Sequence, residues 1–227
     1  MTGVDAVLPD SIAAAWGVRE RPHKGPKPAL TLERIVAAEL GAAAMSLYRH
    51  VSAKEELLTL MVDAAWGDSP DPLADGEGWR SGLCRWAWAM RASIKRHPWA
   101  IRIPLDGLPI MPHAVAWFEH ALACMQDTRL TEARKASVIM LLSGYVRSLG
   151  ATESDIAAAM QASGLSPDEW MSAYPRMLTK LTDPQRFPAL TAFIEAGVFE
   201  AADGPDDEFI FGLDRILDGI EHLVQAS

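Results

Sequence analysis

The chain has 227 residues, of which 49% are hydrophobic and 22% are charged. This composition is typical of a soluble globular protein and excludes collagen-like and low-complexity chains. The longest apolar run, residues 137–146, is too short to cross a bilayer, and the chain opens without a basic leader. We therefore expect a cytoplasmic protein with no membrane partner. Two cysteines, Cys84 and Cys124, cannot form a disulfide framework.

The net charge of −9 is distributed unevenly along the chain. Residues 1–18 contribute −2, residues 19–54 contribute +4 and residues 55–227 contribute −11. A basic segment on an acidic body is typical of a protein that meets a polyanion at one end. The alternative is a basic tail that is simply solvated.

The first third of the chain is predicted to begin irregular and then become helical. Residues 1–29 form a flexible basic arm, because the prolines of the stretch 19–28 prevent a helix there. Thr31 is a plausible N-cap for a first helix, which Gly41 interrupts before a short helix resumes. Ser52 and Glu55 have the spacing of a capping box, and the helix that follows reaches Trp66.

Apolar residues three to four apart predict further helices after a Gly- and Pro-rich loop over 68–78. A second capping box is predicted from Ser166 to Glu169. No segment alternates apolar and polar residues with period two, so the predicted fold class is all-α. The apolar stripes run over 79–94, 115–125, 131–149 and 209–224.

Motifs of enzymes and of metal sites are missing from the sequence. It has no P-loop, no Gly-x-Ser-x-Gly elbow and no His-Glu-x-x-His, so we expect neither an enzyme nor a cofactor. His113 and His120 could share a helix face, but two such histidines are more often ordinary residues than metal ligands, and no metal is expected. Cys84 and Cys124 lie on apolar helix faces and are interpreted as buried, inert thiols.

Five of the eight tryptophans fall between residues 79 and 117. Trp86 and Trp88 cannot share one helix face, so one of them faces something other than a single core stripe. Ordinary core packing is one interpretation, and an apolar pocket walled by aromatic and Met side chains is the other. The ligand-binding residues predicted on the second interpretation are Trp86, Met90, Trp117, Met140 and Tyr145.

The short helix after Gly41 is the most specific feature of the sequence. A Gly turn that leads into a helix of small residues suits insertion into the major groove of DNA, where bulk would block approach. Tyr48, Arg49, His50 and Lys54 supply donors for phosphate around that helix. On the residues alone, a generic pair of helices fits nearly as well.

This stretch resembles the recognition-helix signature of tetracycline-repressor-like (TetR-type) transcriptional regulators. Further similarities extend to a tetracycline-repressor-like C-terminal domain and together reach almost the whole chain. The matching segments are Leu40-Gly41, Met45 to Val51 with Lys54 and Glu56 to Leu58, His97 to Trp99, Ala114 to Trp117, Leu141 to Arg147, and Phe211 to Gly219.

The resemblance implies a homodimeric repressor that binds a double-stranded DNA operator and is released by a small apolar or aromatic effector. Helices near 131–150 and 206–225 would form the dimer's four-helix interface. The basic arm would follow the DNA backbone or enter the minor groove. The implied base contacts are Ala43, Ala44, Met45 and Ser46; the implied phosphate contacts are Tyr48, His50 and Lys54, with Arg49 between the two roles.

The chain departs from the family pattern in length. Relatives place roughly twenty more residues, about one helix with its turns, between the Ile35-Val36 position and the Glu39-Leu40-Gly41 position. Either a segment has been omitted and the numbering closed up, or the chain lacks the scaffold helix that a recognition helix needs. We predict a gap wider than the ~3.8 Å of a trans peptide between consecutive Cα atoms over residues 36–40.

The predicted organisation is a basic arm (1–29), a helix-turn-helix unit (30–67) and a regulatory and dimerisation domain (68–227). The helix over 52–66 joins the last two and is the expected lever between ligand and DNA. Two alternatives remain open: a helical ligand-binding dimer that has lost specific DNA binding, and an all-α enzyme that uses the Trp- and Met-lined cavity.

Overall fold

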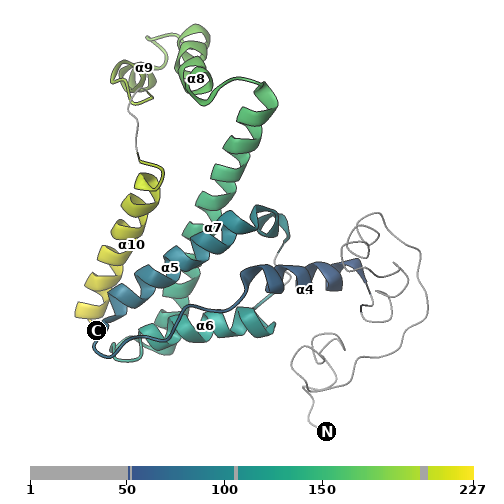
Figure 1. Cartoon of the computed structure of the whole chain (residues 1–227). Helices are drawn as coiled ribbons and strands as arrows, with labels where there is room; N and C mark the ends of the chain where they lie inside the picture. The colour runs from purple at the N-terminus through teal and green to yellow at the C-terminus, as the bar shows by residue number, and fades with distance from the viewer. Residues whose placement is uncertain (1–50, 52, 105–106, 200–203) are drawn as a thin grey trace.

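The structure, a computed structural model, describes residues 51, 53–104, 107–199 and 204–227. All regular structure within these ranges is helical, which confirms the predicted fold class (Figure 1). The predicted arm, the short helix after Gly41 and the predicted break over 36–40 lie outside the described residues. The described elements are α4 (Lys54–Trp66), α5 (Trp79–Arg96), the 3-10 helix η1 (Pro98–Arg102), α6 (Pro112–Cys124), α7 (Glu132–Ser163), α8 (Pro167–Leu181), α9 (Pro188–Glu195) and α10 (Asp207–Gln225).

Helix α5 lies at the centre of the fold and contacts α4, α6, α7 and α10. Its apolar residues recur every three to four positions, so they form one buried stripe that all these neighbours can cover. The neighbours contribute Trp117 from α6, Leu142 from α7 and Phe209 from α10, each at most 5% exposed. The core therefore forms around α5, with the other helices as its walls.

Helix α7 extends well past the predicted stripe over 131–149 and ends at Gly164, whose φ of 69° is left-handed. The predicted capping box follows: Ser166 Oγ accepts from the N–H of Glu169, and Glu169 Oε2 accepts from the N–H of Ser166. Helices α8 and α9 contain no buried residue. They lie at the far end of α7, away from the core (Figure 1).

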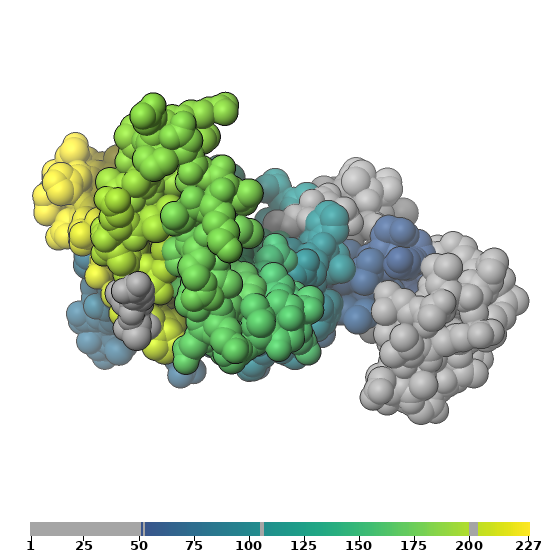
Figure 2. Space-filling view, turned by 90° about the horizontal axis from the view of Figure 1, so that it is seen from above, coloured from purple at the N-terminus to yellow at the C-terminus, as the bar shows by residue number. Residues whose placement is uncertain are grey.

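Helix α4 begins with Ala53 as its N-cap and has no side-chain cap there. Ser52, the predicted capping residue, lies outside the described part. Within the described part, the space-filling view shows α4 at one side and α10 at the opposite side (Figure 2). No helix of the described part combines the length and hydropathy needed to span a membrane.

Tyr145 joins α7 to α10 at a close approach. Its hydroxyl lies 2.9 Å from the carbonyl oxygen of Glu208 and 3.0 Å from that of Phe209, and its ring stacks on Phe209. A Cβ at Gly212 would lie 2.3 Å from the Tyr145 hydroxyl, whereas a Cβ at Gly219, two turns later, would meet nothing within 4 Å. Gly212 is therefore needed for the approach of the two helices.

We predict opposite effects of alanine at these two glycines of α10. Gly212→Ala should lower the free energy of unfolding by about 1–3 kcal/mol, because the methyl group displaces a packed tyrosine. Gly219→Ala, the matched control, should raise it by about 0.5–1 kcal/mol through helix propensity. Urea unfolding followed by circular dichroism measures both; equal effects would contradict the packing.

Candidate functional site

A buried carboxylate fixes α4 to α6. Asp63, on α4, is 6% exposed, and its Oδ1 accepts from the N–H of Ala114 at 3.0 Å. Its Oδ2 accepts from the N–H of His113 at 3.4 Å and lies 2.9 Å from Nδ1 of the same residue. Both N–H groups belong to the first turn of α6, where helical donors lack partners within the helix. We call this arrangement the Asp63 cap.

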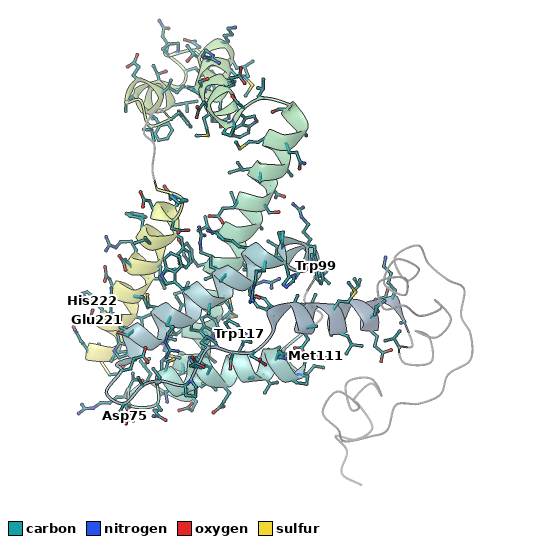
Figure 3. The ribbon with its side chains drawn as sticks, in the orientation of Figure 1. Asp75, Trp99, Met111, Trp117, Glu221 and His222 are labelled. Atoms are coloured by element: carbon teal, nitrogen blue, oxygen red, sulfur yellow. The ribbon has the colours of Figure 1, made fainter. Side chains whose placement is uncertain are left out.

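The Asp63 cap replaces a local N-cap. Met111, the N-cap residue of α6, makes no side-chain cap bond. Figure 3 labels Met111 at the end of α6 that lies beside α4. A carboxylate at a helix N-terminus also compensates the positive end of the helix dipole. The start of α6 is thereby tied to a residue one turn before the end of α4.

Three tryptophans connect the end of α4 to the core, and we call Trp86, Trp117 and Trp66 the tryptophan ladder. The Trp86 and Trp117 rings are 6.0 Å apart, and the Trp117 and Trp66 rings are also 6.0 Å apart. Trp86 Nε1 donates to the carbonyl of Trp117, and Trp117 Nε1 donates to the carbonyl of Gly67, each at 3.0 Å. The ladder therefore links α5, α6 and α4 by ring contacts and hydrogen bonds together.

Arg147, on α7, lies at the outer end of the ladder. Its guanidinium carbon is 5.9 Å from the centre of the Trp66 ring, within the range of a cation–π interaction. The side chain is partly buried, and this burial lowers the pKa of Arg147. An arginine remains protonated at neutral pH even so, so a positive charge is held against the junction of α4 with the core.

The predicted ligand-binding residues do not form one group. Trp86 and Trp117 are in contact, and Met90 belongs to the same buried core. Tyr145 is partly buried against α10. Met140 is 73% exposed and joins none of the other four. The ladder also includes Trp66, which the sequence analysis did not select.

Of the predicted DNA-binding residues, only Lys54 lies within the described part, where it is exposed and begins α4. The predicted base contacts Ala43, Ala44, Met45 and Ser46 lie outside it, as do Tyr48, Arg49 and His50. Their roles stay predictions.

The histidines and cysteines considered in the sequence analysis belong to helix contacts and to the core or its border. His120 is 8% exposed, and burial lowers its pKa, whereas His113 belongs to the Asp63 cap. Cys124 is buried, which raises the pKa of its thiol to about 11 and confirms an inert group at neutral pH. Cys84 is only partly buried, and burial raises its pKa as well. Within the described ranges, no group of three or more His, Cys, Asp or Glu residues could hold a metal ion.

Sequence reasoning missed Asp63, Trp66 and Arg147 as site residues. Arg147 had a visible signal: it lies three positions before the buried Gly150, so a helix places this charge beside a buried stripe. Trp66 also had one, because a large aromatic residue directly precedes the Gly-Asp-Ser-Pro stop of its helix. Asp63 had no signal, because its partners lie 50 and 51 positions away.

We predict that the Asp63 cap stabilises the protein. Asp63→Ala should lower the free energy of unfolding by about 1–3 kcal/mol, because it leaves donors at the start of α6 without a partner. The matched control is Asp68→Ala, since Asp68 is fully exposed and lies 3.7 Å from the other nitrogen of the His113 ring. Thermal unfolding measures both, and a large loss in the control with none in Asp63→Ala would contradict the prediction.

Comparison with known proteins places these features in a family. The family model described as "Tetracyclin repressor-like, C-terminal domain" matches residues 71–224. The HTH-type transcriptional repressor DrrR1 of Streptomyces coeruleorubidus is 37% identical over 234 residues, which cover 92% of this chain and 84% of the relative. An HTH-type transcriptional regulator of Saccharopolyspora erythraea is 29% identical and covers 59% of this chain and 64% of its own.

Solved structures share the fold. ActR of Streptomyces coelicolor in complex with actinorhodin has a TM-score of 0.65 at 21% identity, covering 96% of this chain and 98% of that one. A possible TetR family regulator from Streptomyces coelicolor A3(2) has a TM-score of 0.60 at 22% identity, covering 86% and 90% of the two chains. The family model and the 37% identical repressor together show that this chain belongs to the TetR-type transcriptional regulators with a tetracycline-repressor-like C-terminal domain.

Proposed function

We propose that this chain is a homodimeric repressor that leaves its DNA operator when a small aromatic effector binds the regulatory domain. The observation that carries the proposal is the double attachment of α4. This helix is the last part of the predicted DNA-binding unit, 30–67, and its C-terminal turns are fixed to the regulatory domain by the Asp63 cap and the tryptophan ladder. The domain boundaries 30–67 and 68–227 are part of the proposal.

The effector acts through these attachments. A ligand that binds better to one arrangement of α4, α6 and α7 shifts the population toward it by its difference in affinity for the two arrangements. A repressor dimer must present two recognition helices about 34 Å apart to meet successive major grooves. Rotation of α4 in each subunit changes that separation. The proposal is supported by the names of relatives: DrrR1 is a repressor, and ActR was solved with actinorhodin and with (S)-DNPA.

Helices α7 and α10 form the dimer interface in this proposal. Both present large apolar side chains to solvent in the single chain: Met140 and Leu141 on α7, and Ile210 and Phe211 on α10. Exposed apolar surface of this kind favours association, and two helices from each subunit make a four-helix interface. Met140, first predicted as a ligand residue, fits this interface better because it is exposed and remote from the tryptophan ladder.

A charge at the proposed interface should separate the subunits. Phe211 is 64% exposed, so Phe211→Glu leaves the core of the single chain intact but places a charge against the partner. We expect sedimentation at micromolar concentration to give monomers, with unchanged helix content. Phe193→Glu, on α9, is the matched control and should stay dimeric; a dimeric Phe211→Glu would contradict the proposed interface.

DNA binding is tested on the region upstream of the protein's own gene. We expect a mobility shift that weakens steeply between 50 and 200 mM salt, because phosphate contacts release counterions. Lys54→Ala should weaken the affinity by roughly 3- to 10-fold, an order-of-magnitude expectation for one exposed phosphate contact. Lys180→Ala on α8, equally exposed, should not change it.

A second candidate is a ligand-binding dimer without specific DNA binding. It is favoured by one observation: the alignment with the DrrR1 repressor spans 234 residues, more than the 227 of this chain, so that relative contains residues that this chain lacks. If no shift appears at low salt while the dimer remains intact, the second candidate replaces the first.

A further inference from the structure

Arg147 is an unusual arginine within the described part of the chain. Its guanidinium makes no hydrogen bond and no ion pair with a described residue, although the side chain is partly buried. The other described arginines without an ion pair are all exposed to solvent. They are Arg96, Arg129, Arg134, Arg176 and Arg186.

A buried arginine of the same fold shows how its charge is paired. Arg91, on α5, is 4% exposed and forms ion pairs of 2.9 Å with Glu153 and with Asp206, while its guanidinium carbon lies 4.5 Å from the centre of the Phe209 ring. Arg147 has the aromatic contact, but no carboxylate of the described residues pairs with it. Since burial of an unpaired charge is unfavourable, a missing anion at Arg147 calls for a physical reason.

The guanidinium of Arg147 is not sealed in the core. Among side chains of the described ranges, the polar atoms that are cut off from solvent without a hydrogen bond are Arg91 Nε and His120 Nε2. The nitrogens of Arg147 are not among them, and its side chain is only partly buried, so part of it borders solvent. A molecule that enters this space meets the guanidinium and the Trp66 ring together.

Three carbonyl groups in the last turn of α4 already accept hydrogen bonds. The carbonyls of Ala65 and Trp66, at the negative end of α4, accept from Ser93 Oγ at 2.9 and 3.2 Å. The carbonyl of Asp63 accepts from the N–H of Gly67 at 3.3 Å. The cation–π contact therefore holds the charge beside Trp66, while no described residue accepts from its N–H donors.

We infer that Arg147 binds the acidic group of an anionic aromatic effector, whose ring system lies against Trp66. A guanidinium offers a planar pair of donors that matches a carboxylate, and a tryptophan face suits a fused aromatic ring. This inference rests on the proposed function and adds the chemical class of the effector to it. It also explains how the ligand acts on α4: the residue it covers, Trp66, is the last residue of that helix.

The surface hollow between α5 and α10 offers only arginines that already pair with a carboxylate. It encloses about 510 Å³ and is lined by Arg80 and Arg85. Arg80 already pairs with Asp218 at 2.7 Å, and Arg85 pairs with Glu77 at 2.8 Å. An acidic ligand there would have to displace carboxylates of the protein, whereas at Arg147 it would not.

The test compares two probes of nearly equal shape, anthraquinone-2-carboxylate and anthraquinone-2-carboxamide, on the full chain at pH 7. Binding is followed by quenching of tryptophan fluorescence. We expect the carboxylate to bind roughly 10- to 100-fold more tightly than the carboxamide, as a charge-assisted pair allows. Arg147→Met should reduce this preference to less than about twofold while leaving carboxamide binding nearly unchanged.

Two further variants serve as controls. Arg147→Lys should keep part of the preference, because it retains the charge but loses the planar pair of donors, and it replaces Arg147→Met if that variant does not fold. Arg102→Met, at an exposed arginine of η1, should keep all of it. The inference is overturned if the unchanged protein binds both probes equally, binds neither, or keeps its preference in Arg147→Met.

The same titration with operator DNA present separates this inference from the proposed function. Carboxylate binding that depends on Arg147 without any DNA binding or release supports the inference and contradicts the repressor mechanism. DNA binding that neither probe affects, together with equal binding of the two probes, contradicts the inference and leaves DNA binding standing.

Discussion

The C-terminal end of α4 is held in the regulatory domain by contacts with other helices. Asp63 caps the first turn of α6. The Trp66 ring packs against Trp117 at a tilt, and Ser93 donates to the last carbonyls of α4. A helix of 13 residues is marginal on its own in water. The orientation of α4 therefore depends on α5, α6 and α7, and any rearrangement of these helices alters the direction in which α4 leaves the domain.

The buried and partly buried basic side chains of the regulatory domain differ in whether a carboxylate pairs with them. Arg91 and Lys95 share Asp206, and Arg91 also meets Glu153, so the start of α10 is tied to α5 and α7 by a compact ion-pair group. These pairs fix the relative positions of three helices. Arg147 is partly buried beside α4, and no described carboxylate pairs with it. This contrast with Arg91 is the basis for proposing Arg147 as a ligand-binding residue.

Exposed apolar side chains lie on two parts of the surface. Met140, Leu141, Ile210 and Phe211 lie on α7 and α10, where a second subunit is proposed to bind. Helices α8 and α9 bury no residue and present Met177, Leu181 and Phe193, which lie outside the proposed interface. A segment with so little burial gains little from the hydrophobic effect in the single chain.

The sequence by itself determined the fold class, the central stripe of α5, the capping box at Ser166 and the family, because each of these depends on the spacing of residues close together in the chain. It placed Trp86 and Trp117 in one predicted pocket, and their rings are in contact, but it could not distinguish core from pocket, since both interpretations place the same residues on the same helix faces. Only the tertiary structure decided which residues meet at the end of α4. Asp63 and His113 are 50 positions apart, and Trp66 and Arg147 come from α4 and α7, which α5, η1 and α6 separate in the chain. Periodicity says which face of a helix is buried, but the partner of a buried charge is fixed by how the helices cross.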